Sequence, residues 1–403
     1  MQLQHADGSD VHLTYCSNIH AGESLTEIMD NIVRHIPLIR ENLKIDKPFG
    51  LGLRLSARAA QDLTTRGAME EMLQILAQQN CYVFSINGFP YGPFHGTRVK
   101  EDVYLPDWKD RERLRYTNML ADLFCEFLPD GQTGSISTVP GAFKSNVNTP
   151  GDIAQMTSLY VEHCAHLINL QRDTGKTIVL ALEPEPCCFL ETVEESIDFF
   201  TNHLYSATSA EQLQVVLGRK VDNAPELLRK HLTLCLDLCH AAVEYEHASD
   251  CINDLRTANI NIGKLQISAG LRLTDVTIER ANVLKPFIDP VYLHQVVEKH
   301  GDNINRYTDL PEAFEQLQND SLPEKHTREW RIHFHVPIFL DDLGEFSSTQ
   351  FFIRDALNIH KASPLSEHLE VETYTWDVLP DQYKDLSIDK AIALELGWVK
   401  ENL

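Results

Sequence analysis

Five short segments in the second half of the chain place carboxylates, imidazoles and one amide within or directly after runs of apolar residues. The segments are LALEPEP (180–186), LCLDLCHA (234–241), KLQIS (264–268), RIHFHVP (331–337) and HLEVETY (368–374). They contain the side chains of Glu183, Glu185, Asp237, His240, Gln266, His333, His335, Glu370 and Glu372. Such groups bind divalent cations and transfer protons. The segments therefore predict a metal site with acid–base chemistry, assembled from several parts of the chain.

The polar residues in these segments alternate with large aliphatic residues. Leu182 precedes Glu183, and Leu236 precedes Asp237 in the same way. Because successive side chains of a strand point to opposite faces, this alternation gives one apolar face and one polar face. Strands of a parallel sheet that is covered by helices on both faces read instead as nearly continuous apolar runs. We therefore expect several strands to direct their polar side chains into a common interior.

The first half of the chain repeats this alternation in HLTYCSNIH (12–20), GLGLRLS (50–56) and YVFSINGF (82–89). Residues that favour helix starts lie between the segments, namely Ser56, Thr149 before Pro150, and Ser347 or Ser348. Strand and helix alternate about eight times, which predicts the α/β class and a (β/α)8 TIM barrel. The active site of such a barrel lies at the C-terminal ends of its strands, where the polar residues occur.

A chain of 403 residues fits a single barrel domain with insertions in its loops. We expect one domain over residues 1–403, with insertions near 86–108 and 271–330. One candidate strand is surplus to an eight-stranded barrel. Either YLHQV (292–296) and RIHFHVP pair as an accessory ribbon, or RIHFHVP is itself a barrel strand.

Composition and charge exclude several classes of protein. The formal net charge of −24 argues against nucleic-acid binding, because phosphate backbones are held mainly by clustered lysine and arginine. No run approaches the ~18 apolar residues of a membrane span, and the opening MQLQHADGSD does not resemble a signal peptide. The 9 cysteines, without paired CxxC motifs, fit reduced thiols. We therefore expect a cytoplasmic protein whose partner is a small-molecule metabolite.

Several candidate residues have a structural interpretation beside the functional one. Arg54 and Lys264 lie on the polar strand faces, where they either bind an anionic ligand or pair with carboxylates of the site. Glu370 has the parity of Glu372 but lies deeper, which favours a salt bridge to Lys264 or Arg54. Glu185 is either a site residue or a carboxylate of a loop or helix cap.

The two histidines of RIHFHVP share one strand face. An HxH pair is a frequent arrangement of metal ligands, but it also packs well in an interior. We expect His335 to be either a ligand or a packed residue. His333 is expected to lie behind the ligands or to form hydrogen bonds in the interior.

The segment NGFPYGPFHGTRVK (87–100) is dense in glycine, proline and aromatic residues. Glycine allows close backbone approach, and aromatic rings offer flat apolar surfaces. His95 in this loop, with Tyr374 and Trp376 after the last strand, would line a mouth suited to a larger ligand than a simple sugar phosphate. The alternative is a rigid crossing that packs on the barrel rim.

Longer motifs in the chain resemble a known superfamily. LALEP and CLDLCHAAVEYE, followed by the strand that carries Glu372, Thr373 and Tyr374, are similar to the xylose-isomerase-like TIM barrels, which include sugar epimerases, isomerases and the endonuclease IV group. Other runs, which span nearly the whole chain, resemble the EboE family of metabolite-traffic proteins: NGFPYGPFHGTRVKEDVYLPDW, GSISTVPG, LALEPEPC, YLHQV, WRIHFHVPIF and HLEVETYTWDVLP. This resemblance implies a link to the movement of secondary metabolites, with other proteins of the same operon as partners.

Carried over residue by residue, the resemblance implies metal ligands at Glu183, Asp237 and Glu372. The fourth position, usually a histidine, is Gln266 here. A glutamine carbonyl is a weaker donor than an imidazole. Either His335 supplies the missing nitrogen, or the metal affinity is lower than in the superfamily at large.

The spacing from Asp237 to His240 and Glu244 matches the D-x-x-H-x-x-x-E pattern of the superfamily, which implies that His240 faces the substrate. The divalent metal ion is Mn, Mg, Co or Zn, because mixed oxygen and nitrogen ligands suit all four. The residues predicted to bind the substrate are Arg54, Asn87, His95, Glu185, Glu244, Lys264, His333, Tyr374 and Trp376.

The ligand set favours a divalent-metal-dependent isomerase or epimerase that acts on a sugar-like or polyhydroxylated metabolite. In this interpretation Glu183 and Glu372 transfer protons to and from a substrate carbon, and His240 is a third catalytic residue. A non-catalytic metabolite carrier is the alternative that the traffic association favours. A metal-dependent phosphoester hydrolase of endonuclease IV type fits less well, since that group uses more histidines and basic DNA-binding loops.

Overall fold

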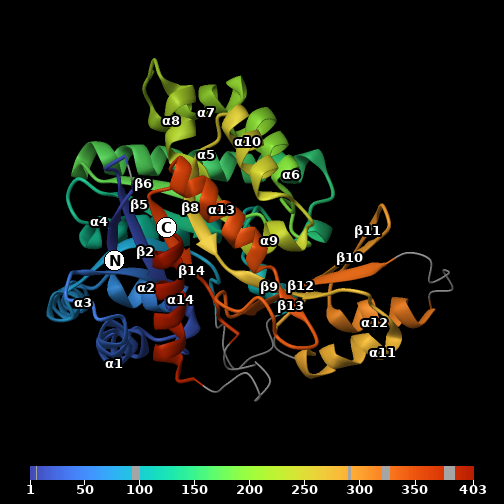
Figure 1. Cartoon of the computed structure of the whole chain (residues 1–403). Coiled ribbons are helices and arrows are strands. Elements are labelled where there is room, and N and C mark those ends of the chain that lie inside the picture. The colour runs from blue at the N-terminus through green and yellow to red at the C-terminus, as the bar shows by residue number, and fades with distance from the viewer. Residues whose placement is uncertain (6, 93–99, 289–291, 320–326, 376–385) are drawn as a thin grey trace.

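Eight parallel strands form the centre of the computed structural model, which describes residues 1–403 except 6, 93–99, 289–291, 320–326 and 376–385 (Figure 1). The strands are β2 (Asp10–Tyr15), β3 (Phe49–Arg54), β4 (Cys81–Asn87), β5 (Thr133–Thr138), β6 (Thr177–Leu182), β7 (Leu232–Asp237), β8 (Ile262–Ile267) and β14 (His368–Val371). From β3 onward each strand pairs with the next in this order, and β14 pairs in turn with β2. A short antiparallel strand, β1 (Gln2–Gln4), extends the sheet beside β2.

The sheet closes between β2 and β3, which confirms the predicted (β/α)8 barrel. A parallel bridge joins Cys16 to Gly52, and the Thr14 hydroxyl donates to the carbonyl oxygen of Gly50 at 2.7 Å. Gly52 is required at this seam, because a Cβ atom there would lie 2.3 Å from Oε2 of Glu370 and 2.7 Å from the carbonyl oxygen of Tyr15. Glycine therefore allows the two strands to approach closely enough to close the barrel.

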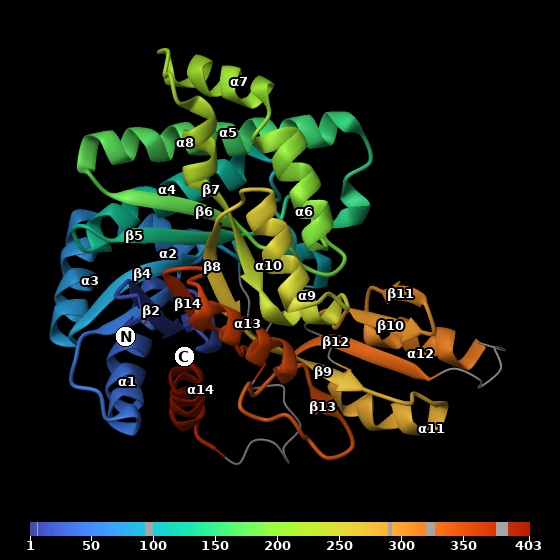
Figure 2. The same ribbon diagram turned by 45° about the horizontal axis from the view of Figure 1, so that its top comes forward.

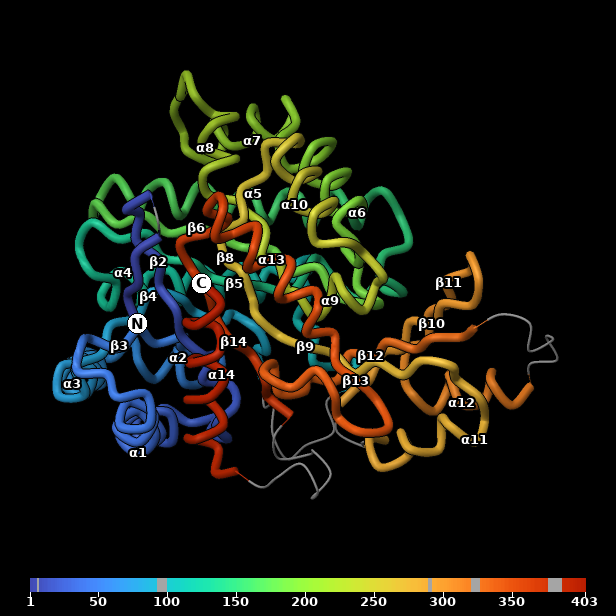
Figure 3. Tube along the Cα trace, in the orientation of Figure 1, coloured from blue at the N-terminus to red at the C-terminus, as the bar shows by residue number. Residues whose placement is uncertain are grey.

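Helices surround the barrel. They include α1 (Leu25–Leu43), α2 (Ala57–Leu63), α3 (Arg66–Gln78), α4 (Arg111–Phe127), α5 (Pro150–Thr174), α9 (Leu238–Val243), α10 (Ala248–Thr257), α13 (Gln350–Ala362) and α14 (Ile388–Asn402). The last helix, α14, packs beside α1, so the two ends of the chain complete the same ring of helices (Figure 3). Among the described residues, no helix is both long and apolar enough to cross a membrane.

The helix starts confirm two of the predicted caps and correct the third. Ser56 accepts a hydrogen bond from the backbone nitrogen of Ala59, and Thr149 accepts one from that of Asp152. The cap residue of α13 is Thr349, not Ser347 or Ser348, which form the short strand β13. The Ser348 hydroxyl still accepts a hydrogen bond from the first residue of α13, Gln350, at 3.2 Å.

A second sheet lies to one side of the barrel (Figures 1 and 2). It consists of β9 (Ala269–Leu273), β10 (Val296–His300), β11 (Asn303–Tyr307), β12 (Arg328–Val336) and β13 (Ser347–Ser348), in the order β11-β10-β12-β9-β13. All of its pairings are antiparallel, and helices α11 (Ile278–Ala281) and α12 (Leu310–Asn319) lie within the same insertion. RIHFHVP is therefore part of an accessory sheet and not a barrel strand. It pairs with β10, which begins at Val296, the last residue of YLHQV, so the predicted ribbon is confirmed only in part.

The insertion bounds differ from the prediction. The accessory sheet runs from β9 to β13, so it extends beyond 271–330 at both ends. A group of helices between β6 and β7 was not predicted as an insertion, namely α6 (Val193–Phe199), the π-helical turn Phe200–Leu204, α7 (Ala207–Leu217) and α8 (Ala224–His231). The connection from β4 to α4 covers the predicted interval 86–108, and its described part contains a 3-10 helix, Lys100–Tyr104.

Candidate metal centre

The C-terminal ends of four neighbouring barrel strands carry the polar residues of the site. Glu183 follows β6 directly, Asp237 ends β7, Gln266 lies near the end of β8, and Glu372 follows β14 directly. Because the strands are parallel and adjacent, their C-terminal ends meet at one mouth of the barrel. The alternation predicted from the sequence therefore brings these four side chains together.

Three carboxylates form the centre of this site. Glu183, Asp237 and Glu372 each offer an oxygen within 4.8 Å of the other two, and their exposed fractions are 8%, 2% and 6%. The Gln266 amide nitrogen donates to Oε1 of Glu183 at 2.6 Å and to Oε2 of Glu372 at 2.5 Å. This amide therefore fixes the two glutamates relative to each other.

Asp237 is held by hydrogen bonds to one of its two carboxylate oxygens. Oδ1 accepts hydrogen bonds from the backbone nitrogens of Cys239 at 2.7 Å and His240 at 3.0 Å, and from the Ser268 hydroxyl at 2.6 Å. These bonds cap the N-terminus of α9 and orient the carboxylate. In the part of the chain that the structure describes, Oδ2 has no hydrogen-bond partner.

Burial of several carboxylates together changes their pKa values. Loss of hydration, with repulsion from Asp237, raises the pKa of Glu183 to about 7. Loss of hydration, with repulsion from Glu183 and Asp237, raises the pKa of Glu372 well above its usual range. A protein that buries three such groups in contact must protonate some of them or hold a cation between them.

The donor set fits a divalent cation. The unpartnered Oδ2 of Asp237 and the unpartnered Oε1 of Gln266 are buried acceptors, and hydrogen-bond donors for them are absent among the described residues. Carboxylate and amide oxygens are ligands that Mg²⁺ and Mn²⁺ prefer. Glu183, Asp237 and Glu372 could hold such an ion, and rotation of the Gln266 amide would turn its oxygen toward the ion as a further ligand.

Three histidines lie beside the carboxylates. His240 comes from α9, and its Nδ1 donates to the carbonyl oxygen of Pro184 at 2.7 Å. Its Nε2 lies 3.1 Å from Nε2 of His333, which belongs to β12 of the accessory sheet. His335, two residues further along β12, groups with Asp237 and His240 within 4.8 Å. The accessory sheet therefore contributes side chains to the mouth of the barrel.

The charges around His240 and His335 differ. Burial would lower the pKa of His240, but the carboxylates of Asp237, Glu185 and Glu183 outweigh burial and raise this pKa to about 9. Burial lowers the pKa of His335 to about 4. In the absence of metal, His240 is thus a cation beside the carboxylates, whereas His335 is neutral.

A pocket opens over the carboxylates. The cavity volume of this pocket, measured as the space that the centre of a water molecule can occupy, is about 50 Å³, which is room for a few waters. Its lining combines polar groups of the site with aromatic and aliphatic side chains. The described lining residues are Asn18, Asn87, Phe89, Pro90, Lys100, Val103, Tyr104, Glu183, Glu185, His240, Tyr292, Leu293, Gln295, His333, Glu372 and Tyr374.

Several residues that were predicted to bind substrate line this pocket. Asn87 donates to Oε1 of Glu372 at 3.3 Å, and Glu185 accepts a hydrogen bond from the Tyr104 hydroxyl at 2.6 Å. Tyr374 lies over the His335 ring, with the ring centroids 4.5 Å apart. His95 and Trp376 lie outside the described residues.

Two other predicted substrate ligands are engaged elsewhere, and this corrects their assignment to the pocket. Arg54 pairs with Glu23 at 2.9 Å and donates to the carbonyl oxygen of Gly92 at 2.6 Å. Its guanidinium group therefore binds the start of the loop that follows β4. Glu244 pairs with Arg306 of the accessory sheet at 2.7 Å. Neither residue is among those that line the pocket.

Lys264 also lies away from the pocket. It is fully buried, and it pairs with Glu370 at 2.7 Å below the carboxylates of the site. Burial alone would lower the pKa of Lys264, but the Glu370 carboxylate outweighs burial and raises it. The predicted salt bridge of Glu370 is confirmed, and the assignment of Lys264 as a substrate ligand is corrected, because its ammonium group already has a buried partner.

Sequence reasoning missed three residues that complete the pocket. Asn18 donates to Oε1 of Glu372 at 2.6 Å, and its place on the polar face of the first strand segment was the available signal. Gln295 lies 3.0 Å from Nδ1 of His333 and donates to the Tyr104 hydroxyl at 3.1 Å. Tyr104 and Gln295 come from the two insertions, where no strand alternation marks a side chain as inward-facing.

The chain is similar to several solved structures. A xylose isomerase-like TIM barrel protein from Mycobacterium smegmatis in complex with magnesium has 13% identity and a TM-score of 0.48, with 99% of this chain and 92% of that chain covered. The IOLI protein with a bound zinc atom has 10% identity and a TM-score of 0.46, with 96% of each chain covered. The probable 3-DHS dehydratase AsbF from Bacillus anthracis, involved in petrobactin synthesis, has 13% identity and a TM-score of 0.44, with 96% and 98% covered. No model of a protein family matches the chain, and neither does the sequence of any curated protein.

Proposed function

We propose that the protein is a divalent-metal-dependent isomerase or epimerase that acts on a sugar-like or polyhydroxylated metabolite. The observation that carries this proposal is the pair Glu183 and Glu372, which reach the mouth from different strands and are bridged by one amide nitrogen of Gln266. Two carboxylates that reach one bound substrate from different strands would provide one group to remove a proton and another to return one.

The residues of the site have different proposed roles. Glu183, Asp237 and Glu372 would hold the ion, which, when bound, polarises a carbonyl group and lowers the pKa of the groups around it. Asn18 and Asn87 donate to Oε1 of Glu372 and so fix the direction of its other oxygen. His240, held by the carbonyl oxygen of Pro184, lines the pocket and presents Nε2 to a ligand or to His333.

The pocket lining supports a metabolite with both polar and apolar parts. Glu183, Glu372 and His240 give the lining its charged groups, whereas Phe89, Tyr104 and Tyr292 give it aromatic rings. Aromatic rings bury flat apolar surface, and a few polar groups fix the orientation of a ligand. The resemblance of the sequence to the EboE family adds a proposed link to secondary-metabolite traffic, with proteins of the same operon as partners.

A metabolite carrier without catalysis is a second candidate, and one observation favours it. The Gln266 amide nitrogen donates to both glutamates, so it partly fulfils the role of a cation between them. In a carrier the same amide would stabilise the carboxylates without any transfer of protons.

Solvent deuterium exchange tests the proposal. Candidate sugars and sugar phosphates are incubated in heavy water with the protein and Mg²⁺ or Mn²⁺, and NMR monitors exchange at the carbon next to the carbonyl. An isomerase exchanges this proton, and Glu372→Gln, which keeps the volume and an oxygen, should abolish exchange while polyol binding stays within about tenfold, or 1.4 kcal/mol.

Glu298→Gln is the matched control. This glutamate is also buried, with an exposed fraction of 3%, but it accepts a hydrogen bond from the Trp330 indole in the accessory sheet and does not line the pocket. The control should exchange like the wild type. Tight binding of a polyol by the metal-loaded wild type without any exchange would reject the isomerase in favour of the carrier.

A further inference from the structure

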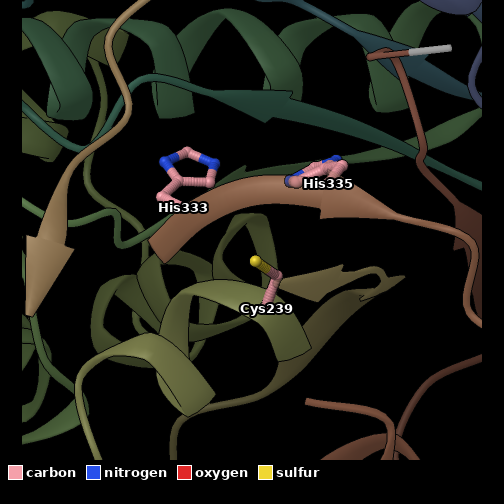
Figure 4. A group of neighbouring side chains, drawn as sticks. All are labelled: Cys239, His333 and His335. Carbon is pink, nitrogen blue, oxygen red and sulfur yellow. The ribbon is translucent and has the colours of Figure 1, made fainter. Parts of the chain in front are cut away.

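Three overlapping groups of ligand atoms surround the histidines of β12. They are Asp237 with His240 and His335, Glu185 with His240 and His333, and Cys239 with His333 and His335, and within each group the atoms lie within 4.8 Å of one another. Figure 4 shows both histidines on β12 and the Cys239 sulfur pointing from α9 toward this strand. We propose a second metal site, rich in nitrogen, in which His240, His333, His335 and Oδ2 of Asp237 bind a transition-metal ion that joins the accessory sheet to the barrel.

The first observation behind this site is the state of His335. The residue is fully buried, and neither ring nitrogen forms a hydrogen bond with any described residue. The backbone of Glu372 lies near the ring, but no bond of acceptable length and angle results. A buried polar group without a partner destabilises the folded state. A metal ion would give one ring nitrogen the partner that it lacks.

The second observation is the spacing of the donor atoms around His240. Its Nε2 lies 3.1 Å from Nε2 of His333 and 3.8 Å from Oδ2 of Asp237. Two ligands of a tetrahedral Zn²⁺ ion with bonds of about 2.0–2.1 Å lie about 3.3–3.4 Å apart. The two observed separations bracket this value, so His333 and Asp237 lie at suitable distances from His240 to share one ion with it.

The groups behind the imidazoles match those found behind metal-bound histidines. The Nδ1 of His240 donates to the carbonyl oxygen of Pro184 at 2.7 Å, and Nδ1 of His333 lies 3.0 Å from the side-chain oxygen of Gln295. A ligating histidine almost always donates its other ring N–H to a carbonyl or carboxylate, which directs the free nitrogen to the ion. In both residues this leaves Nε2 facing the proposed site.

The site is distinct from the carboxylate centre, although the two share Asp237. Glu183 and Glu372 belong to the barrel, whereas His333 and His335 belong to the inserted sheet. Imidazole nitrogens favour Zn²⁺ and Co²⁺, while the carboxylate centre suits Mg²⁺ and Mn²⁺. The inference rests on the proposed function only in that Asp237 contributes to both sites. An ion held in this way would stabilise the contact of β12 with α9.

The test is a count of bound Zn²⁺ by mass spectrometry of the metal after equilibrium dialysis of the full chain, together with visible spectra of the Co²⁺-loaded protein. The wild type should bind two ions and give the intense visible bands of tetrahedral, nitrogen-ligated Co²⁺. His335→Ala should bind one ion and lose these bands. Because a bound ion stabilises the folded state by mass action, Zn²⁺ should also raise the Tm of this variant by less than it raises the Tm of the wild type. His231→Gln, a buried histidine held by the carbonyl oxygen of Ile178, is the control and should bind two.

Each pattern of metal content decides between the sites. One ion in the wild type that is lost in Glu372→Ala, which removes the ligand oxygen, but kept in His335→Ala overturns the second site and leaves the proposed carboxylate centre intact. One ion that is lost in both variants means a single shared centre, which also overturns the inference. One ion that is lost in His335→Ala and kept in Glu372→Ala supports the histidine site and rejects the carboxylate centre. If His335→Ala is unfolded by circular dichroism, His335→Gln gives the same comparison.

Discussion

Lys264 forms a buried ion pair with Glu370, and replacing it tests whether its role is structural or lies in substrate binding. The two side chains have no exposed surface, and Nζ lies 2.7 Å from Oε1 of Glu370. Replacing Lys264 by Met keeps most of the side-chain volume but leaves the Glu370 carboxylate buried without its cation. Removing one partner of a buried ion pair costs about 3–5 kcal/mol, because the remaining charge has lost both water and its counter-ion.

A double-mutant cycle measures this effect. Urea unfolding followed by circular dichroism should give a free energy of unfolding lower by about 3–5 kcal/mol for Lys264→Met. The double variant Lys264→Met/Glu370→Met should recover much of this loss, since no unpaired charge remains. Ligand binding to the folded Lys264→Met protein should be unchanged, because Lys264 does not line the pocket.

The exposed pair Arg66 and Glu70 provides the control. Its side chains are 92% and 64% exposed, and the two atoms lie 2.9 Å apart. Arg66→Met should lower the free energy of unfolding by less than about 0.5 kcal/mol. A loss below about 1 kcal/mol for Lys264→Met, or a double variant as unstable as the sum of the single variants, would refute the buried-pair reasoning.

Two further predictions concern stability. In metal-free protein, the free energy of unfolding should decrease as the pH rises from 6 to 10. The pKa of His240 is raised to about 9, so its contribution to stability is complete below about pH 6.5 and lost as the pH passes 9, and Glu183, with a pKa of about 7, acts in the same direction. Urea unfolding at each pH measures this effect, and a constant midpoint would contradict it. Gly52→Ala should lower the free energy of unfolding by about 1–3 kcal/mol, because the added Cβ would lie 2.3 Å from Oε2 of Glu370. Gly67→Ala is the control, because an added Cβ there would have no atom within 4 Å and so makes no unfavourable contact. Equal stabilities of the two variants would show that the barrel seam relaxes without cost.

The barrel and its three carboxylates could be predicted from the sequence because both follow from strand periodicity. Glu183, Asp237 and Glu372 lie at the ends of strands whose apolar residues alternate with them, so parity and strand order place them at one mouth. His333 and His335 show the same alternation, but a period of two does not distinguish a barrel strand from an inserted antiparallel strand. Only the pairing of β12 with β9 and β10 decides this.

The remaining errors come from side-chain partners far apart in the sequence. Arg54 lies on the polar strand face as predicted, yet its guanidinium binds Glu23 and the carbonyl oxygen of Gly92 in the loop after β4. Tyr104 and Gln295 meet in the pocket although they are separated by 191 positions, and both come from insertions without regular alternation. Such contacts depend on how insertions fold over the barrel, which local patterns do not specify.

Anomalous X-ray diffraction from crystals grown with Mn²⁺ tests the central claim most directly. The account predicts a strong anomalous peak between the carboxylates of Glu183, Asp237 and Glu372, with the Gln266 amide no longer donating to both glutamates. The absence of such a peak, with the Gln266 nitrogen still 2.6 Å from Glu183 as in the structure described here, would contradict a metal centre at the mouth of the barrel.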